Sequence, residues 1–397
     1  IYGNGFKGTL QATFKTPKVS ISALAEFGNT NYQYTSTYRY WRVEAAAIFK
    51  PGLPFLSGIA FYGFGGGASY NMLGSLVPNA TLGKDAYTFT PQKGTFGFKV
   101  QATIGTTPKV ETFNADVGLN GQFSSSNGLI NIGFTGDFYV GADLLPQADR
   151  DKAQIKGSVV ADYNFPDKHF FMHAAVDVDA PPIKTPSASE LTLDSNGKTN
   201  KWFFKFGEPT HTNTVEIFGI NLYEYLMFGN DIQAPANGFT DGFRNEYYKV
   251  VEDYPGIPST PGVDDNSATG RGIALGVGIK IDKSFNANII GNYYLDLVMV
   301  AGAEVNLSMM EYVGQNCADP SQRIGLNGWR ARGNIGFYVD AVAKVVNGED
   351  TWNLANVKVG GWLDAKFPRP TYVAGAVQGN VKIGHWTARA HTFAPWD

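Results

Sequence analysis

The sequence predicts an all-β fold built mostly from antiparallel strands, and three observations support this. Apolar and polar residues alternate along most of the chain, which is typical of strands whose two faces differ in environment. Charged residues are few (17%), whereas aromatic residues (14%) and the 47 glycines are numerous, a composition that suits strands and turns. Turn signals separate the alternating stretches. We therefore expect a large meander of long hairpins curved into a barrel-like or sandwich architecture, with one short helix near residues 240–254.

The first 180 residues contain most of the shorter alternating stretches. These lie at residues 5–15, 19–27, 38–49, 94–104, 113–119, 130–140, 153–165 and 169–178. Pro17 ends the first stretch because proline cannot donate to a strand ladder, and Asn127-Gly128 is a strong signal for a tight hairpin turn. The glycine cluster Gly63–Gly67 interrupts the rhythm. No Lys-Ser/Thr pair follows it, so close backbone packing or a bend explains it better than a phosphate-binding loop.

Residues 181–272 are expected to form an irregular, aromatic-rich connection that contains the helix. Residues 180–200 are polar and rich in proline and serine, while 202–206 and 215–228 have the pattern of aromatic strands. Thr240 or Asp241 can cap a helix that Pro255-Gly256 ends. Its apolar stripe would comprise Phe243, Tyr247, Val250, Val251 and Tyr254.

Residues 273–397 form a second predicted meander, with alternation at 273–281, 303–309, 329–345, 353–367 and 371–383. We expect the apolar side chains of these strands to face a core and the alternating set to face water. The expected core set includes Val305, Val357, Val359, Leu363, Val377 and Val381, and the expected solvent set includes Arg330, Arg332, Asn334, Tyr338, Asp340, Trp362, Asp364 and Lys366. The turn of the hairpin at 353–383 also resembles an earlier one, since Asp364–Pro368 aligns with Asp162–Pro166, which suggests a repeated hairpin module.

The predicted organisation is thus a meander at 1–180, the connection at 181–272 and a meander at 273–397, with one continuous domain as the alternative. The sequence begins with Ile1 and shows no signal peptide, so we expect a processed chain or a fragment of a larger one. No run approaches the roughly 20 apolar residues of a membrane helix. The net charge of −3 comes without a basic cluster, which argues against nucleic-acid binding. Cys317 is the only cysteine, and we interpret it as a buried thiol or as a bridge to a missing part of a longer chain.

The sequence contains no convincing catalytic or metal-binding signature. His169 and His173 would share a strand face about 13 Å apart, too far for one metal ion. Asp177 and Asp179 would lie about 7 Å apart on one strand, whereas the carboxylates of glycosidases converge from separate elements. Asp264-Asp265-Asn266 and Asp194-Ser195-Asn196-Gly197 offer oxygen ligands for Ca²⁺ but lack the full loop spacing, so ordinary turns explain them. The sequence therefore predicts no enzyme activity, no cofactor and no catalytic or metal site.

Several short motifs resemble those of a known group of proteins. They are Trp202–Pro209, Tyr225–Gln233, Ile324–Trp329, Phe367–Tyr372 and Gly63–Met72. Together they resemble a β-rich region of very large secreted or cell-surface proteins of Bacteroidota, the group that uses type IX secretion. The resemblance implies an extracellular or cell-surface location and a role as one region of a longer polypeptide.

Three functions remain open on the sequence. The first is a non-enzymatic structural or adhesive module, with exposed aromatic residues such as Tyr338 and Trp362, whose partners are identical subunits, other parts of the same chain or cell-surface components. The second is a carrier of a lipid or another apolar ligand, in a trough where Gly361, Gly375 and Gly379 leave room. The third is an outer-membrane β-barrel, because apolar-out, polar-in alternation suits one.

Overall fold

The computed structural model describes residues 4–16, 18–30, 37–77, 87–233, 235, 238–251, 268–316, 319–368 and 371–396. Strands make up 76% of the chain, and the all-β antiparallel prediction is confirmed. The chain divides into two compact units. Unit 1 comprises Ile1–Pro181 and Glu190–Lys201, and unit 2 comprises Pro182–Ser189 and Trp202–Asp397. These limits differ from the three expected segments, because residues 181–229 contribute strands to both units.

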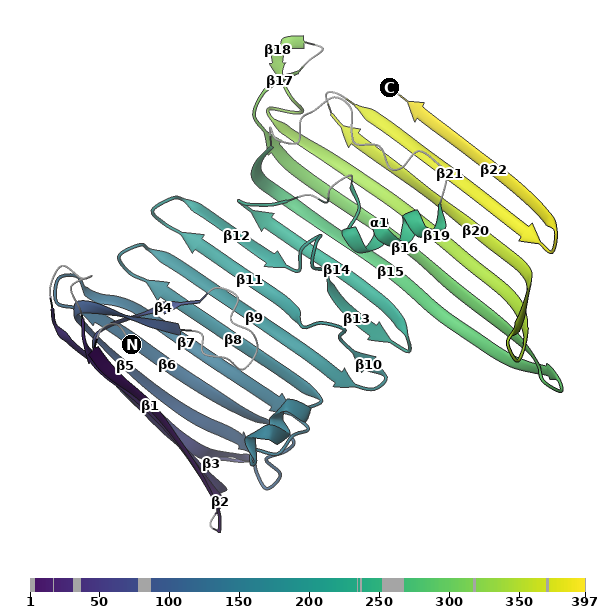
Figure 1. Cartoon of the computed structure of the whole chain (residues 1–397). Helices are drawn as coiled ribbons and strands as arrows, with labels where there is room; N and C mark the ends of the chain where they lie inside the picture. The colour runs from purple at the N-terminus through teal and green to yellow at the C-terminus, as the bar shows by residue number, and fades with distance from the viewer. Residues whose placement is uncertain are drawn as a thin grey trace. The chain divides into compact units, whose positions relative to one another are not determined.

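Unit 1 is a meander in which each strand from β1 to β9 pairs with the next (Figure 1). The strands are β1 (Asn4–Lys15), β2 (Lys18–Asn29), β3 (Arg39–Leu56), β4 (Ile59–Leu76), β5 (Tyr87–Thr106), β6 (Asn114–Ser124), β7 (Gly128–Val140), β8 (Ile155–Asn164), β9 (His169–Ala180) and β11 (Ser189–Asn196), with a 3-10 helix, η1 (Gln147–Lys152). The predicted Asn127-Gly128 turn joins β6 to β7, and Gly128 has the positive φ of 70° that such a turn requires.

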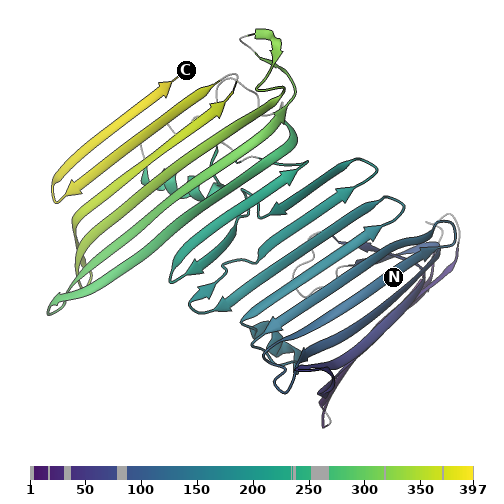
Figure 2. The same cartoon turned by 180° about the vertical axis from the view of Figure 1, so that it is seen from behind.

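Unit 2 is a second meander, seen from both sides in Figures 1 and 2. Its strands are β10 (Ile183–Lys184), β12 (Lys201–Phe206), β13 (Asn213–Ile217), β14 (Ile220–Gly229), β15 (Ala268–Ile290), β16 (Tyr293–Tyr312), β19 (Trp329–Asn347), β20 (Asp350–Phe367), β21 (Tyr372–Ile383) and β22 (Trp386–Trp396), with a small hairpin of β17 (Gln315–Asn316) and β18 (Asp319–Arg323). Consecutive strands from β13 to β16 and from β19 to β22 pair, and β16 pairs with β19 across that small hairpin.

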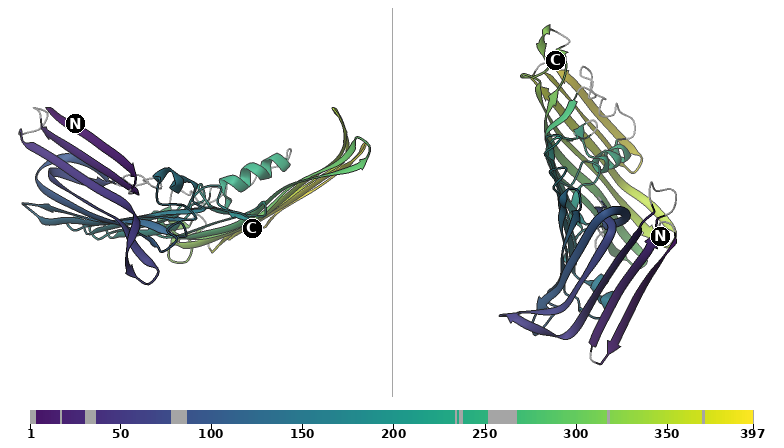
Figure 3. Two further views of the ribbon diagram at one scale, coloured as in Figure 1. Left: turned by 90° about the horizontal axis from the view of Figure 1, so that it is seen from below. Right: turned by 90° about the vertical axis from the view of Figure 1, so that its left-hand side faces the viewer.

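The helix α1 (Asp241–Val250) forms where the sequence predicts it. Thr240 is its N-cap, and the Thr240 hydroxyl accepts a hydrogen bond from the Phe243 amide at 3.3 Å. Phe243, Tyr247 and Val250 are buried, as expected of the apolar stripe, whereas Tyr254 and Pro255 lie outside the described residues. Figure 3 shows α1 lying along one face of the unit 2 sheet.

The alternation in unit 2 is confirmed, but the predicted assignment of its two faces is wrong. On β16, Glu304 is fully buried while its neighbour Val305 is 45% exposed; on β20, Asp364 is fully buried while Leu363 is 39% exposed. The polar face is the covered one. It includes the buried residues Asn306, Ser308, Arg330, Arg332, Asn334 and Lys366, and the exposed apolar face includes Leu307, Met309, Ile335, Phe337, Phe367 and Val377.

The position of α1 explains this inversion. The helix packs on the polar face, where Tyr338 (2% exposed) and Trp362 (4%) lie in one buried cluster with Phe243 and Tyr247. Tyr338 and Trp362 are therefore core residues and not the exposed aromatic contacts expected of an adhesive surface. Alternation of apolar and polar residues indicates that the two faces of a strand differ, but it does not indicate which face a later segment of the chain will cover.

Unit 1 repeats the arrangement, with an exposed apolar face and a polar face that is partly buried. Its exposed apolar side chains include Phe6, Leu10, Phe14, Phe27, Phe64, Phe96, Val100, Leu119, Phe123, Ile132 and Phe134. On the opposite face Glu26, Ser69, Gln122 and Asn131 are buried. No described helix of either unit is long and apolar enough to cross a bilayer.

Candidate functional site

A cavity of about 270 Å³ lies against the polar face of unit 1. The register of the paired strands places its lining residues next to one another. Glu44, Gly67, Lys99 and Asn120 are successive cross-strand partners on β3, β4, β5 and β6. Parallel to this row run Gln101, Gly118 and Thr135, and then Thr103, Asp116 and Asp137. All of these residues line the cavity, so the polar half of the alternation from several strands converges on one space.

Acidic and basic groups in the cavity wall neutralise one another at one end. Arg42 Nε donates to Glu44 Oε1 at 2.5 Å, and Lys99 Nζ lies 3.4 Å from Glu44 Oε2. The Arg42 guanidinium also lies 3.8 Å from the centre of the Phe89 ring. The basic groups are thus held in place by Glu44 and an aromatic face.

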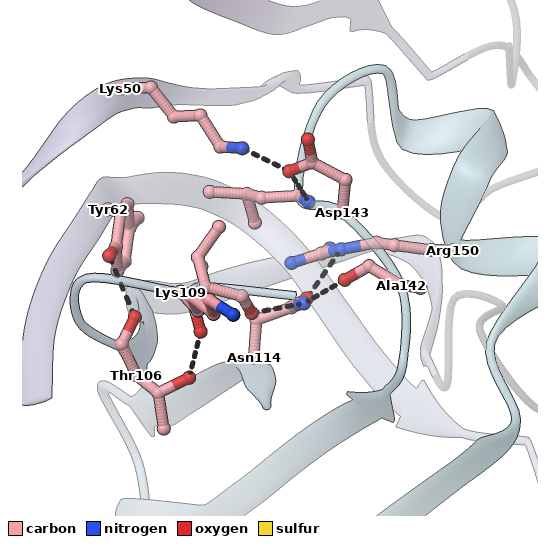
Figure 4. Close-up of polar contacts among 10 residues, drawn as sticks. Lys50, Tyr62, Thr106, Lys109, Asn114, Ala142, Asp143 and Arg150 are labelled. Atoms are coloured by element: carbon pink, nitrogen blue, oxygen red, sulfur yellow. Dashed lines mark hydrogen bonds and ion pairs between the residues drawn. The ribbon is translucent and has the colours of Figure 1, made fainter. Parts of the chain in front are cut away.

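The segment after β7 is attached to the strands beside the other end of the cavity (Figure 4). Arg150, which lies in η1 and is buried, pairs with Asp116 and donates through Nε to Asn114 Oδ1 at 3.0 Å. Thr103 Oγ1 also donates to Asp116, at 2.6 Å. Asn114 Nδ2 donates to the Ala142 carbonyl at 2.9 Å, which ties this segment to β6.

An ion pair and an apolar cluster fix the same segment. Lys50 bonds Asp143, as Figure 4 shows. Burial alone would raise the pKa of Asp143, but the hydrogen bond and charge of Lys50, with backbone N–H donors, outweigh it and hold this pKa below its ordinary value. Beneath the pair, Leu144 and Leu145 pack in a buried cluster with Tyr62, and the other members of that cluster are Ile48, Ala60 and Val110.

The far end of the β4–β5 hairpin covers part of the polar face. A register shift between Tyr70 and Met72 bends the hairpin. Gln122 holds it, because its Oε1 accepts from the Gly74 amide at 3.1 Å and its Nε2 donates to the Gly74 carbonyl at 3.0 Å. Tyr87 Oη donates to Asp162 Oδ2 on β8 at 2.8 Å. This cover brings Tyr87 and Phe89 into the cavity wall.

The glycine cluster Gly63–Gly67 belongs to β4 and borders the cavity. A Cβ at Gly65 would lie 2.6 Å from Gln101 Nε2, and one at Gly67 would lie 2.6 Å from Glu44 Cγ. The interpretation as close packing is therefore confirmed. Sequence reasoning missed the lining residues Arg42, Glu44, Lys99 and Asp116. Their signal was a polar set recurring in phase on consecutive strands, which was interpreted as an exposed face.

The histidine and carboxylate pairs singled out in the sequence have separate partners. His169 Nε2 lies 3.0 Å from Asp194 Oδ2, and His173 Nδ1 lies 3.1 Å from Thr192 Oγ1. Asp177 pairs with Lys156 at 3.2 Å, while Asp179 is exposed. The structure therefore does not bring either pair together on a common ligand.

The proposed calcium segments have a simple account where they are described. Asn196 Oδ1 accepts from the amides of Lys198 and Thr199, both at 3.0 Å, which is ordinary turn chemistry. Asp264-Asp265-Asn266 and Cys317 lie outside the described residues. Within the described part of the chain, no group of three or more His, Cys, Asp or Glu side chains is arranged to hold a metal ion.

The polar face of unit 2 is filled by α1 and by a buried hydrogen-bond network. Glu304 accepts from the Thr240 amide at 2.8 Å, from the Thr240 hydroxyl, and from Asn306 Nδ2 at 2.5 Å. Arg332 makes two bonds of 3.0 Å to Asp364, which also accepts from Asn334 Nδ2 at 2.8 Å. This network holds the helix on the sheet.

Comparisons with known proteins do not assign this chain to a family. No family model, no curated protein and no solved structure matches the chain. The resemblance to large secreted proteins of Bacteroidota stays a prediction that rests on short motifs alone.

Proposed function

We propose that this chain is a membrane-embedded β-sheet protein of the outer-membrane β-barrel class, with its apolar face toward lipid and its polar face toward an aqueous lumen. One observation carries the proposal: both units expose many apolar side chains of their alternation and bury many of the polar ones. Proteins in water rarely expose contiguous apolar patches above a few hundred Å², whereas lipid-facing sheets require them.

The dimensions of the apolar face suit a bilayer. On β21 the outward residues Val373 to Val381 span about nine residues, and a tilted transmembrane strand needs roughly 9–11. Aromatic pairs lie near strand ends, where aromatic girdles meet the membrane interface. Trp352 near the start of β20 stacks on Tyr293 at the start of β16, with ring centres 6.3 Å apart.

The edges of the sheet add a requirement. Among the described pairings, β1 bonds only to β2 and β22 only to β21. Hydrocarbon offers no hydrogen-bond partner to a free strand edge. The proposal therefore requires a partner strand for each of these edges in the membrane.

The same observation disfavours the apolar carrier. Gly361, Gly375 and Gly379 share the exposed apolar face, because they pair in register with Phe337, Leu363 and Val359. A Cβ at Gly361 would lie 2.8 Å from the Phe337 ring, so tight packing accounts for this glycine. The cavity of unit 1 is lined by the charged side chains of Arg42, Glu44, Lys99, Asp116 and Asp137, which does not suit a lipid tail.

Vesicle flotation tests the proposal against the structural module. The purified chain, refolded from denaturant in the presence of phospholipid vesicles, should float with them, resist extraction at high pH and gain protection of its strands from protease. A chain that stays dispersed and monomeric in detergent-free buffer and does not bind the vesicles would contradict membrane embedding and favour the structural module.

A further inference from the structure

We propose that the unit 1 cavity binds a small, neutral, hydroxyl-rich solute of about monosaccharide size. The cavity lies within one compact unit, so the inference does not depend on membrane embedding. Its volume of about 270 Å³ is below the roughly 300–1,000 Å³ typical of drug-sized ligands. A monosaccharide or a comparable polyol is therefore the appropriate size class.

The balance of charge in the wall favours a neutral ligand. Arg42 and Lys99 are both engaged by Glu44, and Asp116 is engaged by Thr103 and Arg150. Asp137, the remaining charged group of the wall, is also engaged by its surroundings. An ionic ligand would have to displace one of these partners, and breaking such a pair leaves a poorly solvated charge without compensation. A neutral solute can bind without displacing any of them.

The polar groups left available favour hydroxyls. Ser69 is 2% exposed, it lines the cavity, and its Oγ has no hydrogen-bond partner among the described residues. A buried hydroxyl without a partner is costly, and a ligand hydroxyl can satisfy it because it both donates and accepts.

Two further groups of the cavity wall also suit a hydroxyl-rich ligand. The Gln101 amide also lines the cavity, where it presents one acceptor and two donors. Phe89 adds an aromatic surface to the wall: the Arg42 guanidinium covers one face of this half-buried ring, and the C–H face of a sugar ring can pack against the part that remains exposed. Donors, acceptors and an apolar face together are what a pyranose requires.

Three hexoses that differ in charge serve as probes: glucose, glucosamine and glucuronate. Binding to the full chain in detergent micelles is measured by titration calorimetry and by saturation-transfer NMR. We expect saturable binding of glucose and weaker binding of both charged analogues. Absence of saturable glucose binding at 25 °C would overturn the inference, and preferred binding of either charged analogue would overturn the neutral ligand class.

Matched variants test whether the ligand binds in the cavity. Gln101→Leu keeps the volume but removes the amide, and should weaken glucose binding about tenfold, while Ser69→Ala should weaken it about threefold. Val100 directly precedes Gln101 on β5, but its side chain lies on the exposed apolar face. Val100→Ala should therefore leave the affinity for glucose within about twofold. Circular dichroism and gel mobility of the folded form check each variant. Glucose binding that a folded Gln101→Leu variant retains unchanged would overturn the assignment to this cavity.

Discussion

At the scale of single residues, the buried pair of Arg332 and Asp364 shows how the polar face is stabilised. Asp364 is fully buried, and two bonds from Arg332 with one from Asn334 satisfy its oxygens. A bidentate guanidinium–carboxylate pair is stable in such a place only while both partners remain. The pair therefore fixes β19 and β20 to each other across the enclosed face.

Removal of the Asp364 carboxylate should be strongly destabilising. Asp364→Ala leaves the Arg332 charge buried without a counter-charge, and we expect the free energy of unfolding to fall by about 3–5 kcal/mol. Denaturant titration of the refolded chain measures this. Leu363→Ala, on the exposed face of the same strand, should cost about 1 kcal/mol or less. Equal losses in the two variants would contradict the burial assigned to Asp364.

The same two residues mark the limit of sequence reasoning. The alternation of Leu363 with Asp364 predicted the strand and its two faces, and both are observed. The natural assumption of a water-soluble protein then placed Leu363 inside and Asp364 outside, which is wrong. The information that decides the matter is the packing of α1 on this sheet, a long-range contact that local periodicity does not contain.

At the scale of elements, α1 depends on the sheet beneath it as much as on its own sequence. The predicted cap Thr240 and the predicted stripe of Phe243, Tyr247 and Val250 are confirmed. The partner of the cap was not predictable, because Glu304 lies far along the chain on β16. Helix formation was thus encoded locally, but its docking site was not.

The Thr240 cap gives a test of that docking. Thr240→Ala removes the hydroxyl that accepts from Phe243 and bonds Glu304. We expect a loss of roughly 1–2 kcal/mol in the free energy of unfolding, measured by denaturant titration. Thr240→Ser retains the hydroxyl and should lose much less. A serine variant as unstable as the alanine variant would show that the methyl group, not the cap, matters.

Glu246 should make the attachment of α1 dependent on pH. Burial raises the pKa of this carboxylate, but the hydrogen bonds and charges of Lys280 and Lys249, at 3.0 and 3.1 Å, outweigh it and lower the pKa below its ordinary 4.5. A carboxylate whose pKa is lower in the folded state stabilises the fold above its unfolded pKa and loses that contribution as the pH falls through the folded pKa.

The comparison of wild type with Glu246→Gln measures this contribution. The wild type should unfold at higher denaturant concentration at pH 7, and the difference should shrink as the pH falls below 4.5 toward the lowered pKa. Glu349→Gln, in the exposed turn between β19 and β20, serves as the control for a generic loss of charge. A wild-type advantage that persists unchanged in acid would contradict the role given to the Lys280 pair.

At the scale of the whole molecule, the fold class and the helix could be predicted from the sequence, whereas the environment of each face could not. Two-residue periodicity is equally compatible with a sandwich in water and a sheet in lipid. The cavity residues were hidden for the same reason, since Lys99 and Asp116 look like ordinary solvent-facing positions until the sheet curves around them. A measurement that depends on the medium outside the apolar face is therefore the decisive one.

Two arginine substitutions on β21 provide that measurement. Val377 lies in the middle of the apolar stretch and is 45% exposed, while Ile383 is the last residue of the strand and is 62% exposed. They lie about 20 Å apart along the strand. In water both positions would accept arginine with little change, because each side chain already contacts solvent.

In a bilayer the two variants should differ in stability. An arginine at the midplane of a lipid-facing strand costs about 2–4 kcal/mol, against about 0–1 kcal/mol near the interface. Folding into vesicles, followed by denaturant titration, should show the larger penalty for Val377→Arg and almost none for Ile383→Arg. Equal stability of the two variants, or improved dispersion of Val377→Arg without lipid, would mean that water and not hydrocarbon lies against this face.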